Sequence, residues 1–155
     1  MGHIHKDIDL TVSIYIVNDG KVLLVLHKKL KNWLPVGGHV ELHEDAEEAL
    51  RREIVEECGL EVELMNPSTP EVPGITDMKF LPVPDGFDIH GVGGGHRHMN
   101  LVYFGTSSNN KFTLDEREHN SIRWFTIEEL DDPAWDIWPS IKFYAKQAIN
   151  KATGT

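Results

Sequence analysis

The chain has a single cysteine, no long apolar run and few basic side chains relative to acidic ones. Cys58 has no second cysteine to pair with, which excludes an intrachain disulfide and fits a reducing compartment. No stretch approaches the roughly 20 apolar residues that span a membrane, so we expect no membrane association. The first residues also lack the apolar segment of a secretory signal, and we therefore expect a cytoplasmic protein.

The charge balance is strongly acidic. There are 15 lysine and arginine residues against 25 aspartate and glutamate residues, a formal net charge of −10. This sign disfavours a partner that is gripped through a phosphate backbone, so we expect no nucleic-acid partner. A phosphorylated small molecule can still bind an acidic protein if metal ions supply the positive charge. The composition therefore favours metal-mediated binding of a small molecule.

The length of 155 residues suits one domain with a real core and is short for two. Hydrophobic residues make up 40% and charged residues 26%, which is typical of a globular protein. No repeat, low-complexity tract or break in composition divides the chain. We therefore expect a single domain over residues 1–155, with a core of about 9–150.

The first third of the chain predicts a hairpin and then a helix. Residues 10–17 and 21–27 read as strands, and Asn18-Asp19-Gly20 between them is a strong signal for a tight turn. A helix is predicted from Ala46 to Cys58. Asp45 can cap its start with Glu48 as the reciprocal partner, and Gly59 can end it.

The rest of the chain predicts further strands around a long loop. Strands are expected at 60–65, 98–106 and 121–125, and a last helix follows Pro139. The segment 66–98 is rich in proline and glycine, and we expect a functional or mobile loop with one short strand near 78–81. Strands precede and follow both helices, so an α/β (α+β) fold with a mixed sheet between helices is expected.

The predicted helix concentrates acidic side chains on one side. At about 100° per residue, Glu53, Glu56 and Glu57 fall within a sector of roughly 100°, beside the apolar stripe of Leu50 and Ile54. On a solvated face, like charges at these spacings cost a few tenths of a kcal/mol per pair. A bound Mg²⁺ or Mn²⁺ would convert that repulsion into coordination, because these ions prefer oxygen ligands. With the preceding glycine pair, the cluster indicates a metal-dependent diphosphate site.

The same segment resembles the Nudix box, G-x₅-E-x₇-R-E-U-x-E-E-x-G-U, in which U is an aliphatic residue. The matching residues are Gly38, Glu44, Arg52, Glu53, Ile54, Glu56, Glu57, Gly59 and Leu60. The stretch 123–130 is also similar to the family, and the resemblance spans residues 9–150. It implies a Nudix-like α/β/α sandwich with a central mixed sheet. It also implies a hydrolase that cleaves the diphosphate bond of a nucleotide-type small molecule by water attack on phosphorus.

The resemblance assigns metal ligands within the box. It implies that Glu53 and Glu57 are the main ligands of Mg²⁺ (or Mn²⁺). Glu56 would be a third ligand or the group that activates water, and the carbonyl of Gly37 or Gly38 would add a further ligand. The number of ions and the identity of the general base stay open.

Other positions would support the catalytic groups. The resemblance implies that Arg52 and Glu44 hold the helix and its loop in register, and that Gly59 ends the motif. Family members often carry another acid on the loop before the strand that contains the tryptophan, and Glu118 is the candidate here. Glu116 is the alternative.

Candidate substrate contacts lie outside the box. His96, Arg97 and His98 follow a glycine-rich segment. They form either a solvent-exposed hairpin loop or a substrate contact, with the two histidines on one strand face and Arg97 on the other. A zinc site is less favoured, because no cysteine or carboxylate stands at ligand spacing. Trp33 either stacks on a base or packs in the core or at its rim.

Two other functions fit the same fold. A nucleotide-binding module that does not hydrolyse its ligand usually lacks one or more box acids, and this box is intact. A diphosphate isomerase relies on a cysteine outside the box, whereas Cys58 lies inside it.

The substrate itself is not fixed by the sequence. Some ADP-ribose and dinucleoside-polyphosphate enzymes carry proline or tyrosine about 15 or 16 residues after the position of Leu60, where this chain has Ile75 and Thr76. The upstream pattern of coenzyme A enzymes is also missing. A nucleoside triphosphate or a nucleotide-sugar remains the generic expectation. Many relatives are homodimers, so a homodimer is one candidate state.

Overall fold

The structure is a computed structural model that describes residues 3–113, 116–117 and 119–155. The strands are β1 (Ile8–Asn18), β2 (Lys21–His27), β3 (Trp33–Leu34), β4 (Val36–His39), β5 (Glu63–Leu64), β6 (Gly86–Gly93), β7 (His96–Thr106) and β8 (His119–Phe125). The helices are α1 (Ala46–Glu57), α2 (Ile127–Asp131), the short 3₁₀ helix η1 (Pro133–Trp135) and α3 (Pro139–Thr153). None of the helices within these ranges is long and apolar enough to cross a membrane.

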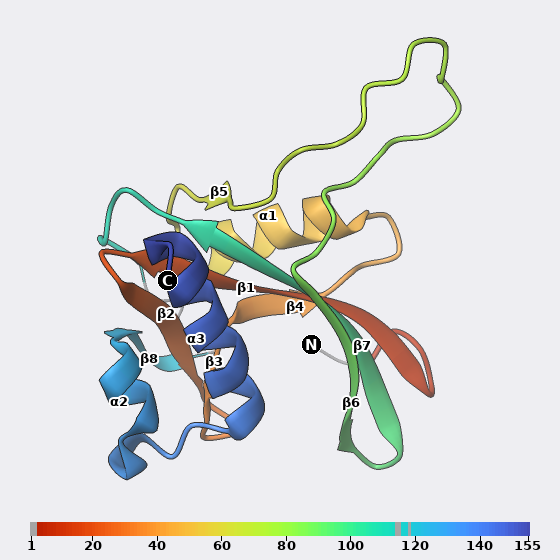
Figure 1. Ribbon diagram of the computed structural model, residues 1–155. Coiled ribbons are helices and arrows are strands. Elements are labelled where there is room, and N and C mark those ends of the chain that lie inside the picture. Colours follow the sequence, from red (N-terminus) through yellow and green to blue (C-terminus); the bar gives the residue numbers. More distant parts are fainter. Residues whose placement is uncertain (1–2, 114–115, 118) are drawn as a thin grey trace.

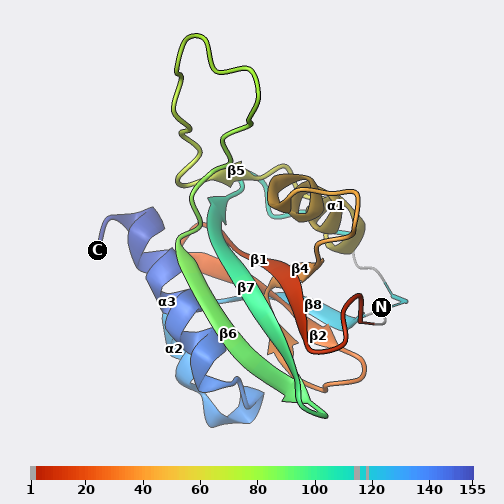
Figure 2. The same ribbon diagram turned by 90° about the vertical axis from the view of Figure 1, so that its right-hand side faces the viewer.

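Within the described residues the strands form one mixed eight-stranded sheet with β1 near its centre. β1 pairs in parallel with β7 and antiparallel with β2 and β4. The main order is β3-β2-β1-β7-β5, and β6 and β8 add to β7 and β2. Helix α1 covers one face of the sheet, and α2 and α3 cover the other (Figures 1 and 2). The predicted α/β/α sandwich with a mixed sheet is confirmed.

Each face of the sheet has its own hydrophobic core. Ile14 of β1 packs with Leu50 on the α1 side, whereas the next residue, Tyr15, packs with Ala145 on the α3 side. The alternation follows from the pleat, which directs successive side chains to opposite faces. Each fully buried large apolar side chain contributes roughly 1.5–3 kcal/mol. The central strand is therefore fixed from both sides, which makes it a firm base for a site.

The local signals at the first turn and first helix are confirmed. Asp19 and Gly20 both have positive φ, at 47° and 72°, as the tight hairpin turn between β1 and β2 requires. The Asp45 side chain accepts from the backbone N–H of Glu48, and the Glu48 side chain accepts from that of Asp45. Gly59, with φ +65°, follows the end of α1.

The prediction for residues 66–98 is partly wrong. No strand forms at 78–81, and residues 66–79 extend away from the sheet (Figure 1). The last third of the segment is instead β6, which pairs with β7 from Gly86 to Gly93. The predicted strand over 60–65 is shortened to Glu63–Leu64. These differences arise because pairing with β7, and not the local pattern, decides where the neighbouring strands form.

Candidate functional site

The glycine pair of β4 lies against the acidic side of α1. The backbone N–H of Gly37 donates to Oε1 of Glu57 at 2.9 Å. A Cβ atom placed on Gly38 would lie only 2.2 Å from Oε1 of Glu53. The Glu53 carboxylate therefore approaches the backbone of Gly38 at a distance that leaves no room for a Cβ atom, and the Glu57 carboxylate is held by the neighbouring N–H of Gly37. This contact explains why the glycine pair and the acidic helix belong to one site.

The three acids predicted to share a sector have different surroundings. Glu53 and Glu57 are buried, with 5% and 3% of their surface exposed, whereas the Glu56 side chain is 50% exposed. Burial, reinforced by the charge of Glu57, raises the pKa of Glu53 to about 8. Two adjacent buried carboxylates are unfavourable without positive charge nearby. The site is therefore prepared for a cation.

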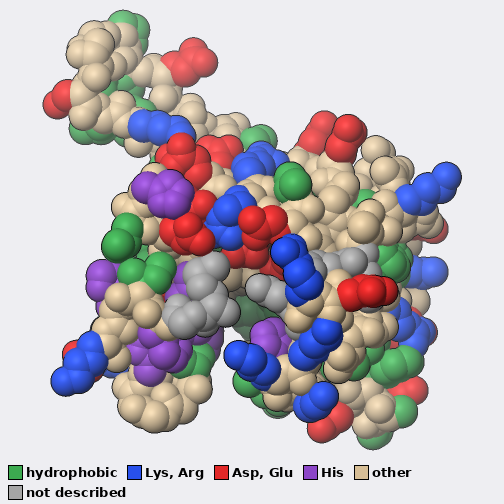
Figure 3. Space-filling view, turned by 180° about the vertical axis from the view of Figure 1, so that it is seen from behind, with side chains coloured by type: hydrophobic (Ala, Val, Ile, Leu, Met, Phe, Trp, Pro, Cys, Tyr) green, Lys and Arg blue, Asp and Glu red, His purple; other side chains and the backbone are tan. Residues whose placement is uncertain are grey.

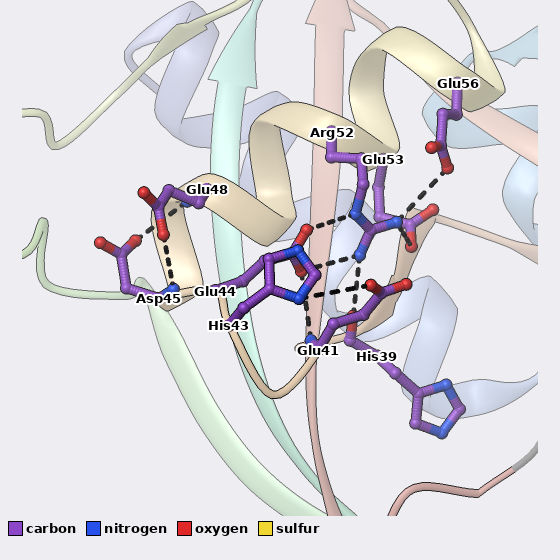
Figure 4. Close-up of polar contacts among 9 residues, drawn as sticks. All are labelled: His39, Glu41, His43, Glu44, Asp45, Glu48, Arg52, Glu53 and Glu56. Carbon is purple, nitrogen blue, oxygen red and sulfur yellow. Dashed lines mark hydrogen bonds and ion pairs between the residues drawn. The ribbon is translucent and has the colours of Figure 1, made fainter.

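Arg52 connects the helix to the loop that precedes it (Figure 4). Its Nε and Nη2 donate to the two carboxylate oxygens of Glu44 at 2.6 and 3.0 Å, and Nη2 also donates to the carbonyl oxygen of His39 at 3.0 Å. Its Nη1 reaches Glu53 at 2.7 Å and Glu56 at 3.3 Å. The hydrogen bond from Arg52 lowers the pKa of Glu44. These contacts join the loop of Glu44 to α1, and the holding role of the pair stays a prediction.

The residues present fit a divalent cation. They offer two buried carboxylates, a half-exposed third carboxylate and the backbone carbonyls of β4, an all-oxygen set of the kind that Mg²⁺ and Mn²⁺ prefer. Arg52 donates to Glu53, whereas Glu57 contacts the backbone N–H of Gly37 and the ring of His119. A cation would remove the repulsion within the buried pair. Figure 3 shows acidic side chains gathered around basic ones on this side of the molecule, with histidines nearby.

His119 is a site residue that the sequence did not reveal. It is buried at the start of β8, and its Nε2 lies 2.5 Å from Oε2 of Glu57. It thus contacts one carboxylate oxygen while Gly37 holds the other. The predicted extra acid, Glu118, lies outside the described residues. Its alternative, Glu116, is exposed, and its backbone carbonyl accepts a hydrogen bond from the side chain of Lys28.

The predicted substrate contacts fall in two separate places. Trp33 is buried in the core on the α3 side, with its ring 4.9 Å from that of Phe125 and perpendicular to it. This position favours the core alternative for Trp33. His96 is buried, His98 is half-buried and Arg97 is exposed, so the two histidines share one strand face as predicted.

The two histidines contact a carboxylate that the sequence reading did not connect with them. Asp9 of β1 lies beside His98 in the parallel β1–β7 register, and Nε2 of His96 is 3.1 Å from Oδ2 of Asp9. A carboxylate therefore does lie within ligand distance of these histidines, although the spacing along the sequence showed none. Spacing along one strand could not reveal an acid 87 residues away on its neighbour.

Comparison with known proteins gives a consistent set of relatives. The family described as NUDIX domain matches residues 7–147. An oxidized purine nucleoside triphosphate hydrolase of Mus musculus is 25% identical over 145 residues, which cover 92% of this chain and 80% of that protein. A NUDIX-family hydrolase from Clostridium perfringens is 35% identical, with a TM-score of 0.78 and coverage of 92% of this chain and 96% of that one. A MutT NUDIX hydrolase from Burkholderia pseudomallei, 22% identical with a TM-score of 0.67, covers 92% of this chain and 98% of its own and shares the fold.

Proposed function

The chain belongs to the NUDIX family of hydrolases, and we propose that it cleaves the diphosphate bond of a nucleoside triphosphate with Mg²⁺ or Mn²⁺. The observation that carries this proposal is the buried pair of Glu53 and Glu57 against the glycines of β4. The murine relative, itself named as a nucleoside triphosphate hydrolase, supports the substrate class. A nucleotide-sugar is the second candidate, because it carries the same diphosphate.

Each residue of the acidic site has its own role in the proposed reaction. Glu53 and Glu57 would hold the ion, and Gly37 and Arg52 fix their carboxylates through hydrogen bonds. When bound, the ion neutralises the diphosphate and lowers the pKa of a bound water. Glu56 is half exposed, so it can reach a water molecule that the buried acids cannot. We assign it the role of orienting or deprotonating the attacking water.

Water is the nucleophile in this proposal, so no covalent enzyme intermediate forms. Attack on the phosphorus next to the nucleoside breaks its bond to the bridging oxygen. The products of a triphosphate would be a nucleoside monophosphate and pyrophosphate. The same chemistry on a nucleotide-sugar yields two phosphate esters, and this difference in products separates the two candidates.

The test is a product assay with Glu57→Gln and a matched control. Triphosphates with ordinary and oxidised bases, nucleotide-sugars and dinucleoside polyphosphates would be incubated with Mg²⁺, Mn²⁺ or chelator, and the products coupled to pyrophosphatase or phosphatase. We expect metal-dependent release of pyrophosphate from triphosphates. Glu57→Gln should lose at least about 100-fold in kcat. Glu61→Gln, which alters an exposed acid just beyond α1, should match the parent.

Two results would contradict the proposal. A Glu57→Gln variant that hydrolyses at the parental rate would remove the assignment of the metal ligands. Silence across the whole panel, with nucleotide binding still measured by calorimetry, would favour the non-hydrolysing binding module. Thermal unfolding of both variants would establish that the glutamine forms are folded.

A further inference from the structure

Four side chains with metal-binding atoms meet beside the first half of β1. They are His3, Asp9, His96 and His98, which we term the histidine cluster, and their ligand atoms all lie within 4.8 Å of one another. Asp9 shares a sheet face with Tyr15, because both are odd-numbered residues of β1, and Tyr15 packs on the α3 side. The cluster therefore lies on the face opposite α1, away from the acidic site.

Asp9 is the centre of the cluster. Its side chain is fully buried, and its Oδ2 has three imidazole nitrogens around it. Nε2 of His96 and Nε2 of His39 both lie 3.1 Å away, and Nδ1 of His3 lies 3.3 Å away. One carboxylate oxygen cannot accept good hydrogen bonds from three rings at once. Such convergence of nitrogen and oxygen atoms is typical of a cation site.

The neighbours of His96 determine which of its ring nitrogens carries a proton. Its Nδ1 lies 3.0 Å from the carbonyl oxygen of Lys6, which can only accept, so Nδ1 must carry a proton. In a neutral ring, Nε2 then has a lone pair that faces Oδ2 of Asp9 at 3.1 Å. A cation between the two atoms removes that repulsion. Metal-ligating histidines commonly donate their other N–H to a backbone carbonyl in this way.

Within the cluster, Nε2 of His98 is buried without a hydrogen-bond partner among the described residues. Nε2 of the neighbouring His39 is also buried without a hydrogen bond, and its polar contact is the ion-pair distance of 3.1 Å to Asp9. An unsatisfied buried polar atom costs about 1–3 kcal/mol. The cluster therefore holds one potential ligand atom, Nε2 of His98, that makes no hydrogen bond within the described residues.

We propose that the histidine cluster binds one Zn²⁺ ion, separate from the Mg²⁺ or Mn²⁺ of the acidic helix. Three imidazoles and one carboxylate are a donor set that suits Zn²⁺, whereas Mg²⁺ prefers oxygen atoms alone. Tetrahedral bonds of about 2.0–2.1 Å place ligand atoms about 3.4 Å apart, so the cluster needs only modest closing. The His3 side chain is 52% exposed and leaves a path for the ion to enter.

The ion would fix the N-terminal segment to the sheet. The backbone N–H groups of Ile4 and His5 already donate to Asp9, at 3.2 and 2.7 Å. His3 would add a metal bond to these contacts. His39 lies beside the cluster, and Figure 4 shows its ring directed away from Arg52 although its carbonyl oxygen faces the guanidinium. The ion would thus order the N-terminal segment and stabilise β4, the strand that carries Gly37 and Gly38.

The test is a metal titration of the full chain, stripped with chelator and supplied with excess Mg²⁺. Co²⁺ binding is followed by its visible absorption bands, and Zn²⁺ binding by calorimetry and by displacement of Co²⁺. We expect one Zn²⁺ per chain. His98→Gln and His3→Gln should each weaken it by about 10- to 100-fold or more. His90→Gln is the matched control, since His90 adjoins His98 but pairs with Asp88, and its affinity should equal that of the parent.

Other measurements keep the proposal separate from the catalytic site. Glu57→Gln should bind Zn²⁺ like the parent, and Zn²⁺ should slow hydrogen exchange at the amides of Ile4 and His5 in the parent but not in His3→Gln. Absence of Zn²⁺ binding would overturn the proposal. Binding that is lost in Glu57→Gln and kept in His3→Gln would also overturn it. The half-exposed His3 keeps the test decisive if His98→Gln fails to fold.

Discussion

Gly37 and Gly38 are adjacent, yet the structure predicts opposite responses to an added methyl group. A Cβ on Gly38 would lie 2.2 Å from Oε1 and 2.6 Å from Cδ of Glu53. These atoms end a flexible side chain, so the carboxylate can move away by about 1 Å to reach ordinary contact, near 3.5 Å. A displacement of about 1 Å at a reacting centre can cost about 100-fold in rate. Gly38→Ala should therefore lower kcat about 100-fold with little change in Tm.

Gly37→Ala is the matched control because its obstacle is backbone. The added Cβ would lie 2.2 Å from the carbonyl oxygen of Val12 and 2.8 Å from Cα of Ser13. Both belong to the central strand β1, which cannot retreat without breaking its pairing with β4. Overpacking of this kind costs about 3 kcal/mol. For a chain of this length, that corresponds to a fall in Tm of about 10 °C.

The assay combines hydrolysis at saturating substrate with thermal unfolding followed by tryptophan fluorescence, in chelator and with Mg²⁺. Gly38→Ala should keep its Tm in chelator and lose the stabilisation by Mg²⁺. Gly37→Ala should melt early under both conditions. A Gly38→Ala variant with parental kcat would show that the position of the Glu53 carboxylate does not affect turnover. An equal loss of Tm in both variants would show that the Glu53 carboxylate is not free to move.

Two further substitutions test the charges of the site. In chelator, burial and the charge of Glu57 raise the pKa of Glu53 from its ordinary 4.5 to about 8. The stability that Glu53 contributes is therefore present below pH 4.5 and is lost as the pH rises through 8. The test measures the free energy of unfolding in urea for the parent and for Glu53→Gln. The parent's value minus the variant's should fall by a few kcal/mol between about pH 5 and 9. A difference that stays constant with pH would contradict this. Arg52→Lys keeps the charge but loses the forked contact with Glu44, so it should cost about 2 kcal/mol in urea unfolding. Exposed Arg51→Lys is its control, and equal losses in the two variants would count against the special role of Arg52.

The parts of the fold that depend on local chemistry could be predicted. The turn at Asp19-Gly20 needs residues that tolerate positive φ, and the helix start needs a reciprocal cap, which Asp45 and Glu48 supply. Strand β6 could not be predicted, because its residues show no clear alternation and its three glycines suggest a loop. It is a strand because β7 offers an edge to pair with, and an edge depends on the tertiary fold.

The acidic site was predictable in outline and not in detail. Helical geometry placed Glu53, Glu56 and Glu57 on one side of α1, but only the position of β4 decides that Glu56 stays half exposed. Glu48 and Glu56 both lie four residues from Arg52, yet Arg52 contacts only Glu56 of the two, because the Glu48 side chain serves the helix cap. His119 reaches the site from a strand 62 residues beyond Glu57 in the chain, a contact that no local pattern encodes.

Strand β4 explains how one sheet can offer two sites with different metal preferences. Successive residues of a strand face opposite ways, so Gly38 faces the carboxylates of α1 while the ring of His39 lies beside Asp9 and the histidine cluster. The α1 face collects mainly oxygen donors, with the His119 ring beside Glu57, and the other face collects mainly imidazole nitrogens. Ligand chemistry, and not distance, would therefore keep Mg²⁺ and Zn²⁺ apart. The Arg52 hydrogen bond to the His39 carbonyl joins the two faces, so a metal ion that ordered the proposed cluster would also restrain the loop before α1.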